Sequence, residues 1–236
     1  MVELLYQTDS YIRDFTAQVT AVDADQRAVY LNRTAFYPGG GGQPHDTGVL
    51  IAGDQTFIVA AVGRGNAHLI DDEALPQVGA EVRGVVDWAR RYQLMRTHTA
   101  MHILCGVVWR DYGASVTGGN MEPLKGRMDF EFERLQKELV GEIEARINAE
   151  VAAARDVIVR ILPREDAFQI PDLIRTKINL LPEGITEVRT VELAGLDLQA
   201  DGGTHVANTR EVGRIRITDY KSKGGINKRI YVELDE

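Results

Sequence analysis

The stretch Arg96–Leu104, RTHTAMHIL, lies where the chain changes from strand-like to helical patterning. It carries two of the five histidines, His98 and His102, four residues apart in an apolar setting that favours an α-helix. On a helix such residues share one face, with Cβ atoms roughly 5–6 Å apart, so two imidazoles can converge on one ion. The spacing alone also fits two ordinary helical histidines. It lacks the glutamate that a HExxH metalloprotease carries after its first histidine.

On the N-terminal side of this stretch, short apolar runs alternate with turn residues. The runs cover residues 15–23, 28–36, 47–53, 56–63, 68–70 and 81–87. A spacing of about 8–12 residues between such runs is typical of a small antiparallel sheet or barrel. We therefore expect a β-barrel-like domain over residues 1–87, with helix at most in the first dozen residues.

From Asp87 onward the pattern is mixed. Asp87 and Thr97 are candidate N-caps of two successive helices, and the longest helix is expected over residues 134–155, where apolar residues recur every four positions. Strands are expected at 127–132, 157–162, 187–196, 210–220 and 227–234, and a short interrupted helix at 164–174. The sequence thus predicts an α+β fold, with the barrel-like domain followed, over residues 88–236, by a domain with an antiparallel sheet and a long helix.

Composition restricts the class of protein. The 236 residues are 44% hydrophobic and 26% charged, with a formal net charge of -8. No apolar run approaches the roughly 20 residues of a membrane helix, and the first residues lack the pattern of a secretory signal. The single cysteine, Cys105, cannot form an internal disulfide. We expect a cytoplasmic protein with Cys105 as a buried, inert thiol.

A second motif, LQADGGTHVANTREVG at residues 198–213, places Asp201 and His205 four residues apart. Between them lie Gly202, Gly203 and Thr204, and glycines permit tight turns and close approach of a ligand. Three histidines, with or without a carboxylate, make a zinc set that leaves a position for water. By itself the motif also fits a glycine-rich turn with a surface histidine.

These motifs together resemble the editing domain of alanyl-tRNA synthetase and the free-standing alanyl-tRNA editing proteins of the AlaX type. The resemblance is carried by HTAMH, by GGTHVANTREVG downstream, and by TAFYPGGGGQPHDTG at residues 34–48 upstream. The order of the three motifs and the chain length match the medium-length members, so the resemblance spans nearly the whole chain. At this length we expect no ATP-dependent activation domain.

The resemblance implies a zinc-dependent hydrolase that removes a wrong amino acid, chiefly serine, from tRNA(Ala). It implies His98, His102 and His205 as zinc ligands. Where the family usually has cysteine, this chain has Asp201. Asp201 is therefore expected either as a fourth ligand or as a catalytic group outside the ligand set that orients a histidine or the water. Whether zinc activates water or holds the substrate stays open at this point.

The resemblance also implies substrate contacts. The glycine-rich loop is expected to fold over the pocket, with Gln43 as a catalytic residue at the aminoacyl group or terminal ribose, although a mobile surface loop is the alternative. The other expected substrate-binding residues are Gly41, Gly42, Gly202, Gly203 and Thr204.

Basic residues gather near the C-terminus. Between Asn208 and Tyr231 seven basic and two acidic side chains give a local charge of +5 in an acidic chain. We expect this hairpin to contact the phosphates of the tRNA acceptor end, although a solvated hairpin is the alternative. The expected RNA-binding residues are Arg210, Arg214, Lys221, Lys223 and Lys228. Two other functions stay open: a zinc hydrolase of small aminoacyl esters or amides without RNA, and a non-catalytic tRNA-binding module.

Overall fold

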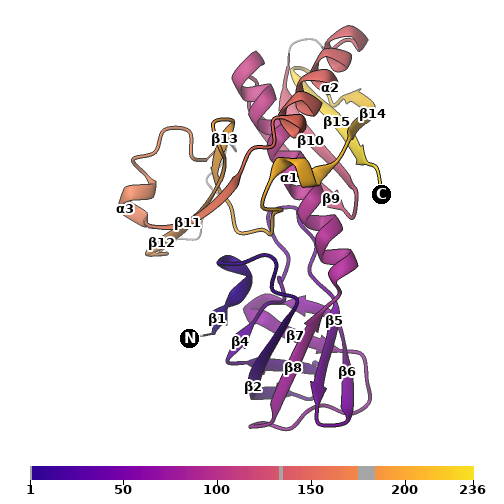
Figure 1. Cartoon of the computed structure of the whole chain (residues 1–236), viewed down its shortest axis with the longest axis vertical. Coiled ribbons are helices and arrows are strands. Elements are labelled where there is room, and N and C mark those ends of the chain that lie inside the picture. The colour runs from indigo at the N-terminus through magenta and orange to yellow at the C-terminus, as the bar shows by residue number, and fades with distance from the viewer. Residues whose placement is uncertain (1, 133–134, 175–183) are drawn as a thin grey trace. The chain divides into compact units, whose positions relative to one another are not determined.

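The computed structural model describes residues 2–132, 135–174 and 184–236 (Figure 1). The chain divides into two compact units, Met1–Gln93 and Leu94–Glu236. The division lies inside helix α1, Trp88–Tyr112, so the stretch RTHTAMHIL lies near the start of the second unit. The α+β fold expected from the sequence is confirmed.

The first unit is built around a closed six-stranded barrel with the strand order β2-β3-β7-β6-β5-β8. Its strands are β2 (Asp14–Asp23), β3 (Ala28–Leu31), β5 (Gly48–Ala52), β6 (Gln55–Gly63), β7 (Ala67–Ile70) and β8 (Glu81–Val86). Pairing of β2 with β8 closes the barrel, so each of its strands has a neighbour on both sides. A short parallel pair, β1 (Glu3–Leu4) with β4 (Arg33–Thr34), lies outside it.

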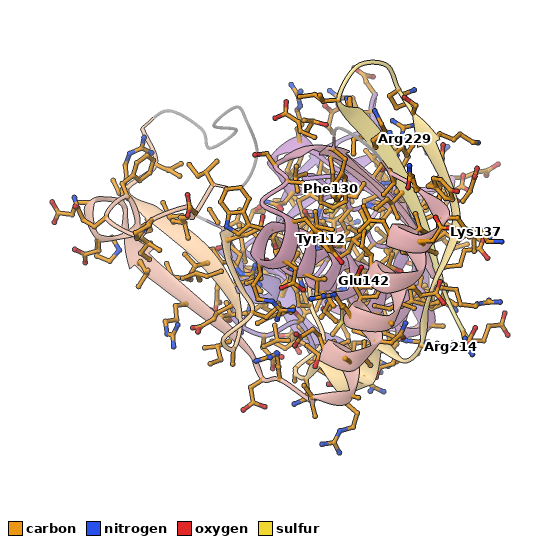
Figure 2. The ribbon with its side chains drawn as sticks, turned by 90° about the horizontal axis from the view of Figure 1, so that it is seen from above. Tyr112, Phe130, Lys137, Glu142, Arg214 and Arg229 are labelled. Atoms are coloured by element: carbon orange, nitrogen blue, oxygen red, sulfur yellow. The ribbon has the colours of Figure 1, made fainter. Side chains whose placement is uncertain are left out.

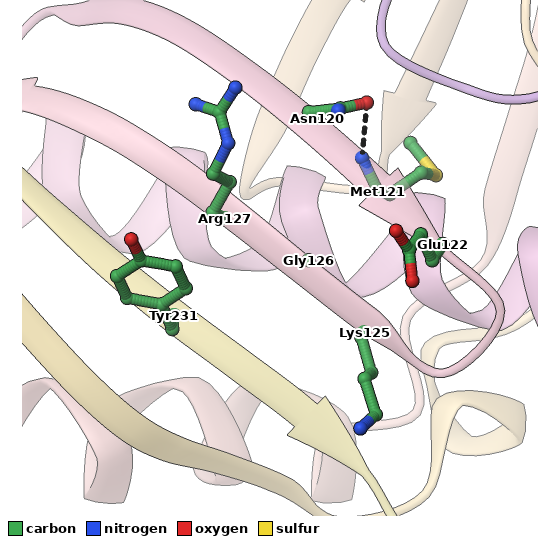
Figure 3. Close-up of a pocket in the computed structure, with 7 residues that line it drawn as sticks. All are labelled: Asn120, Met121, Glu122, Lys125, Gly126, Arg127 and Tyr231. Atoms are coloured by element: carbon green, nitrogen blue, oxygen red, sulfur yellow. Dashed lines mark hydrogen bonds between the residues drawn. The ribbon is translucent and has the colours of Figure 1, made fainter.

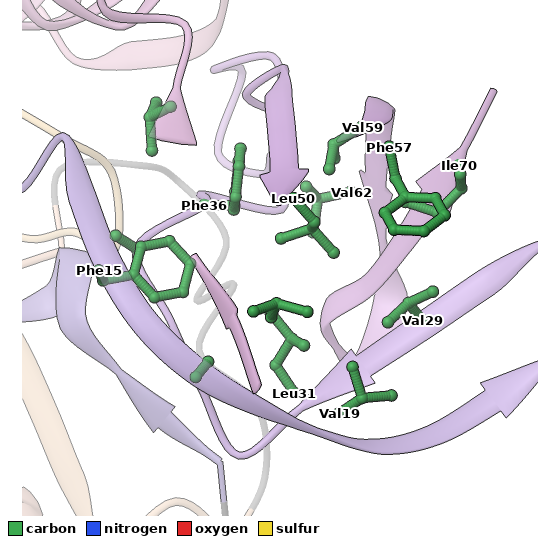
Figure 4. Close-up of a cluster of buried hydrophobic side chains, with 14 of the residues drawn as sticks. Phe15, Val19, Val29, Leu31, Phe36, Leu50, Phe57, Val59, Val62 and Ile70 are labelled. Atoms are coloured by element: carbon green, nitrogen blue, oxygen red, sulfur yellow. The ribbon is translucent and has the colours of Figure 1, made fainter. Parts of the chain in front are cut away.

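Alternating side chains fill the barrel. In β2 the inward residues Phe15, Ala17 and Val19 are buried while their neighbours are exposed, as a half-buried strand requires. Leu50 and Phe57 meet them inside the barrel (Figure 4). A Cβ on Gly84 would lie 2.4 Å from the ring of Phe15, so the glycine makes room for that ring. The core therefore depends on period-two patterning that the sequence displays.

A buried ion pair fixes the first turn of α1 within this unit. Arg91 is fully buried and its Nε donates to both carboxylate oxygens of Asp46 at 3.0 Å. Its Nη1 donates to the carbonyl of Ser10 at 2.9 Å. A buried guanidinium is tolerated because its donors are satisfied. Asp46 belongs to the glycine-rich motif, which is thereby held by the helix.

The second unit contains two antiparallel sheets. One has the order β14-β15-β10-β9 and the other β11-β12-β13 (Figure 1). The first comprises β9 (Val116–Glu122), β10 (Lys125–Glu131), β14 (Ile215–Ser222) and β15 (Asn227–Leu234). The second comprises β11 (Val157–Pro163), β12 (Glu187–Leu193) and β13 (Asp197–Ala200), and the helices are α2 (Lys137–Ala152) and α3 (Arg164–Ala167).

The expected break at Thr97 is wrong, because α1 runs through it as one helix of 25 residues, longer than the 16 of α2. No glycine or proline interrupts residues 88–105, so helical propensity carries the chain past the threonine. Thr97 is fully buried and its hydroxyl accepts the backbone N–H of Leu124 at 2.9 Å. The sequence does not predict strands β9 and β13, since glycines and a short length obscure their alternation. Among the described residues no helix is both long and apolar enough to cross a membrane.

Ion pairs link the end of α1 to α2. Arg146 of α2 bonds Asp111 at 2.9 Å and Glu142 at 2.6 Å, and its guanidinium lies 5.7 Å from the ring centre of Tyr112. Tyr112 and Glu142 are labelled in Figure 2. Exposed pairs of this kind each contribute at most about 1 kcal/mol. They fix the register of the two helices rather than hold the unit together.

Candidate metal centre

Helix α1 presents His98 and His102 on one face, with ring centres 5.1 Å apart. Each is 5% exposed, so neither imidazole is a surface side chain. Buried polar groups require partners, and these are supplied by the start of β13 and the loop after that strand.

The loop after β13 brings the other two residues to the same place. The ring of His205, 3% exposed, lies 4.2 Å from that of His98 and 4.8 Å from that of His102. Asp201 folds back because its carboxylate accepts the backbone N–H of Gly203 at 2.8 Å. The structure thus unites His98, His102, Asp201 and His205, with one ligand atom from each within 4.8 Å of the others.

The outer nitrogens of two imidazoles have protein partners. His102 Nδ1 lies 3.1 Å from Asp197 Oδ2, and His205 Nδ1 lies 3.1 Å from the hydroxyl of Thr99. Both contacts use Nδ1, which leaves Nε2 for the centre of the cluster. The Nε2 atoms of His205 and His98 lie 3.0 Å and 3.5 Å from the two oxygens of Asp201. Partners of this kind fix the tautomer and orientation of metal-binding histidines.

Close packing at a glycine makes the contact to Asp197 possible. A Cβ on Gly106, one helical turn after His102, would lie 2.9 Å from Leu196 Cγ and 3.0 Å from Asp197 Cβ. The helix therefore needs glycine at this position to let the start of β13 approach. Gln199, two residues along the strand, donates to Asp197 Oδ2 at 2.6 Å and reaches Cys105 Sγ at 3.3 Å. Cys105 is buried and lies outside the four-residue group found among the described residues.

A cation stands beside the acidic member. Arg189 of β12, itself 9% exposed, donates from Nη1 to the carbonyl of Asp201 at 2.8 Å, and the same atom lies 3.6 Å from its carboxylate. When the three imidazoles are neutral, the Asp201 carboxylate and this guanidinium cancel each other's charge, and the Asp197 carboxylate at His102 adds one negative charge. They can therefore accept a divalent cation without first overcoming an excess positive charge.

Burial and charged neighbours together decide the protonation of these groups. Burial lowers the pKa of His205 to about 4 and that of His98 well below its ordinary value. For His102 burial also disfavours the charged form, but the hydrogen bond and charge of Asp197 outweigh it and raise the pKa. Burial would raise the pKa of Asp201, but the neighbouring imidazoles outweigh it and bring that pKa well below its usual range. Neutral imidazoles and an ionised carboxylate are the forms that bind metal.

The glycine-rich motif, in the first unit, forms an ordered turn. Gly40 and Gln43 exchange backbone hydrogen bonds of 3.0 Å and 2.9 Å. Gly41 and Gly42 have φ of 57° and 92°, a region that L side chains rarely adopt. Gln43 is 2% exposed. In the second unit Gly203 and Thr204 are buried beside His205, and Gly202 is exposed.

The expected RNA-binding residues fall into two groups. Arg210, Arg214, Lys221 and Lys223 are exposed. Lys228 is 8% exposed and its ammonium donates to the carbonyl of Gly225 at 2.5 Å. Lys228 therefore stabilises the turn between β14 and β15. The other four basic residues remain candidates for contact with phosphates.

Sequence reasoning does not identify three residues at the cluster, namely Thr99, Arg189 and Asp197. Thr99 lies inside the HTAMH motif, but spacing cannot show that it faces His205. Asp197 and Gln199 alternate along one strand, and that period-two pattern is the available signal. Arg189 lies between Val188 and Thr190 in β12, and its burial indicates a partner for the charge.

Two segments of the chain match known protein families. Residues 188–231 match the model described as the threonyl and alanyl tRNA synthetase second additional domain, and residues 5–90 match the class II (A) tRNA synthetases. The metal cluster is thus split between α1 and the first of these matched regions.

Full-length relatives extend the match. The chain is 39% identical to a protein of Saccharolobus solfataricus named alanyl-tRNA editing protein AlaX-M, covering 98% of both chains. It is 38% identical to the protein of the same name from Methanosarcina acetivorans, covering 99% of both. It is also 36% identical to the alanine–tRNA ligase of Ignicoccus hospitalis, of which it covers 24%. The chain belongs to the AlaX-M family of alanyl-tRNA editing proteins.

Proposed function

We propose that the chain is a trans-editing hydrolase that deacylates mischarged tRNA(Ala), chiefly Ser-tRNA(Ala), at a zinc ion held by His98, His102, His205 and Asp201. One observation carries the proposal: a member of this family has four potential ligands, largely buried, within 4.8 Å of one another. Names of the relatives supply the substrate class, alanyl-tRNA editing.

The donor set fits zinc. Imidazole nitrogens and a carboxylate oxygen are zinc ligands at roughly 2.0–2.2 Å, which puts ligand atoms of a tetrahedral site about 3.4 Å apart. The separations of 3.0 Å and 3.5 Å between Asp201 and two histidines are close to that value. Because both carboxylate oxygens face the cluster, we assign Asp201 as a ligand rather than as a group outside the ligand set.

A bound zinc ion supplies Lewis acidity that lowers the pKa of water to about 7 and polarises an ester carbonyl. The surrounding protein residues orient the ligands. Asp197 and Thr99 hold His102 and His205 in one tautomer, and Arg189 limits the movement of Asp201. Burial of the ligands excludes bulk water, which strengthens each electrostatic contact.

Discrimination between seryl and alanyl esters requires a group that binds the hydroxyl. A site built to hydrogen-bond a hydroxyl rejects a substrate that lacks it, because its own polar groups are then left unpaired. We assign this role to Thr204 and the amide of Gly202, next to His205, because the amide of Gly203 already donates to Asp201. Gln43 remains a candidate for the aminoacyl group or terminal ribose, on the family resemblance, and Arg210, Arg214, Lys221 and Lys223 for the acceptor phosphates.

The deciding experiment compares Ser-tRNA(Ala) and Ala-tRNA(Ala) as substrates of metal-free protein and of protein reloaded with zinc. We expect the zinc form to release serine much faster than alanine and the metal-free form to release neither. Equal inertness toward both substrates contradicts editing. Equal rates with a small seryl ester and with Ser-tRNA(Ala) at every salt concentration favour a hydrolase that does not bind RNA.

Two variants and a control make the result specific. His102→Ala should lose metal and deacylation together, while Cys105→Ala, on the same helix but outside the cluster, should retain both. Gln43→Ala should retain metal and lose deacylation. Full activity of Gln43→Ala would exclude a catalytic role for that amide.

A further inference from the structure

The sheet β14-β15-β10-β9 has a face with a pocket that the proposed chemistry does not use. The pocket has a volume of about 210 Å³ and is lined by Asn120, Glu122, Lys125, Arg127 and Tyr231, among others (Figure 3). Ligand pockets for drug-sized molecules are roughly 300–1,000 Å³. This pocket therefore has room for one planar ring system.

Strand register puts the lining side chains on one face. Arg127 of β10 pairs directly with Asn120 of β9 on one side and with Tyr231 of β15 on the other, and Tyr231 pairs with Asp219 of β14. Directly paired residues project to the same side of a sheet. The opposite face carries Met128 and Ile230, which are buried. The pocket thus lies on the polar, solvent-facing side.

Tyr231 offers an aromatic surface among cations. Lys221 Nζ lies 5.0 Å from its ring centre and the Arg229 guanidinium 6.0 Å. In Figure 3 the Tyr231 ring and the Arg127 side chain stand on neighbouring strands beside the same groove. Asn120 is oriented there because its Oδ1 accepts the N–H of Met121 at 2.9 Å. A partly buried aromatic ring between basic residues is the arrangement on which nucleobases stack.

Charge on this face is nearly balanced except beside Tyr231. Lys221 pairs with Asp219 at 2.9 Å. Arg229 holds both oxygens of Asp129 at 2.6 Å and 2.7 Å. The Arg127 guanidinium reaches the same carboxylate at 3.6 Å. Two guanidiniums therefore share one carboxylate, which leaves a local positive charge next to the ring.

The pocket also has a connection to the metal centre. Glu122 and Lys125 flank the turn between β9 and β10, and Leu124 in that turn donates its N–H to Thr97 of α1 at 2.9 Å. Thr97 immediately precedes His98. The turn beside the pocket is thus fixed to α1 one residue before the first of the proposed metal ligands.

We propose that this pocket binds one nucleotide, with its base stacked on Tyr231 and its phosphate held by Arg127. Assignment of that nucleotide to the tRNA substrate, upstream of the terminal adenosine, rests on the proposed function. Binding of a nucleotide as such does not depend on it.

The test measures binding of three probes: AMP, a labelled single-stranded RNA hexanucleotide and deacylated tRNA(Ala). Tyr231→Ala should weaken binding of the RNA probes on the order of 10-fold, the usual loss when a stacking ring is removed, and Tyr231→Phe should restore it. Arg127→Ala should weaken binding and reduce its salt dependence. Tyr220→Ala is the matched control, because Tyr220 is an exposed tyrosine of the same sheet that pairs with Ile230 and projects to the other face.

The outcomes separate this proposal from the proposed function. Hydrolysis of a small seryl ester should be unchanged in Tyr231→Ala, since no described contact joins Tyr231 to the metal ligands. Loss of AMP binding alone, with unchanged RNA affinity, identifies a free nucleotide as the ligand. Equal affinities of Tyr231→Ala, Tyr220→Ala and the parent protein for all three probes overturn the proposal, whether or not the protein deacylates Ser-tRNA(Ala).

Discussion

His102 Nδ1 lies 3.1 Å from Asp197 Oδ2, so the imidazole is oriented by a carboxylate that is not itself in the four-residue cluster. Gln199 donates to the same oxygen at 2.6 Å and holds the carboxylate in place. The metal centre therefore includes two residues that motif spacing does not identify, Asp197 and Gln199.

Asp197→Ala is expected to lower metal affinity by about 10–100-fold, the usual cost of removing an orienting partner from a metal-binding histidine. Asp197→Asn should fall between the parent and the alanine variant, because an amide oxygen still accepts the imidazole N–H but carries no charge. Competition with a chromophoric chelator measures the affinity. Identical affinity of all three proteins would show that His102 needs no partner.

Two substitutions of Asp201 test whether its carboxylate is a zinc ligand. Asp201→Cys should tighten zinc binding, because a thiolate is a softer ligand and zinc is borderline-soft. Asp201→Ala should weaken it and leave Arg189 with a carbonyl alone as its partner at this residue. Metal content after dialysis against a weak chelator reports both. Undiminished zinc in Asp201→Ala would place the carboxylate outside the ligand set.

Two helical glycines make a matched comparison. A Cβ added to Gly141 of α2 would meet no packed neighbour within 4 Å among the described residues, so Gly141→Ala should raise the free energy of unfolding by up to about 1 kcal/mol. Gly106→Ala gains the same helical propensity but would push against Leu196 and Asp197 at 2.9 Å and 3.0 Å. We expect lower metal affinity in Gly106→Ala alone. Chemical denaturation and metal titration of both variants test this, and an equal gain in stability without metal loss would contradict the close packing.

How far the sequence predicts this site depends on the range of the contacts. The pairs His98–His102 and Asp201–His205 are local spacings, and the structure brings them together. Asp197 reaches His102 across 95 residues, a contact that only tertiary packing at Gly106 creates. Local patterning also predicts a helix break at Thr97 that does not occur, because the hydroxyl serves the distant Leu124. Elements with clean periodicity are predicted well, and β15 matches its expected range of 227–234.

His68 should make the stability of the barrel depend on pH. It is fully buried, with Nδ1 3.0 Å from the carbonyl of Val29 and Nε2 2.8 Å from the hydroxyl of Thr34, a pattern that suits the neutral ring. Burial lowers its pKa from 6.5 to about 4, although the hydrogen bond to Val29 opposes this. The unfolded chain therefore takes up the proton first as the pH falls.

The resulting stability is present above pH 6.5 and is lost as the pH falls from there towards 4, by about 2.5 kcal/mol between pH 7.5 and 4.5. Urea unfolding at these two pH values should show that loss in the parent protein. In His68→Gln the loss should be smaller by about that amount, because the other titrating groups are unchanged. Parallel losses in both proteins would show that His68 does not titrate differently on folding.

Two lysines of the hairpin between β14 and β15 look alike in sequence but differ in their exposure and contacts. Lys223 is exposed, whereas Lys228 is 8% exposed and its ammonium bonds the carbonyl of Gly225. Lys223→Glu should raise KM for Ser-tRNA(Ala) by about 5-fold and lower the slope of log affinity against log salt by about one, the effect of removing one phosphate contact. Lys228→Met should instead lower the free energy of unfolding and leave the salt slope unchanged, because its charge serves the turn. Salt titrations of tRNA binding, with zinc content as the control for folding, decide between these roles. If Lys228→Met reduces the salt slope as much as Lys223→Glu does, both ammonium groups contact RNA and the hairpin must open to expose the second.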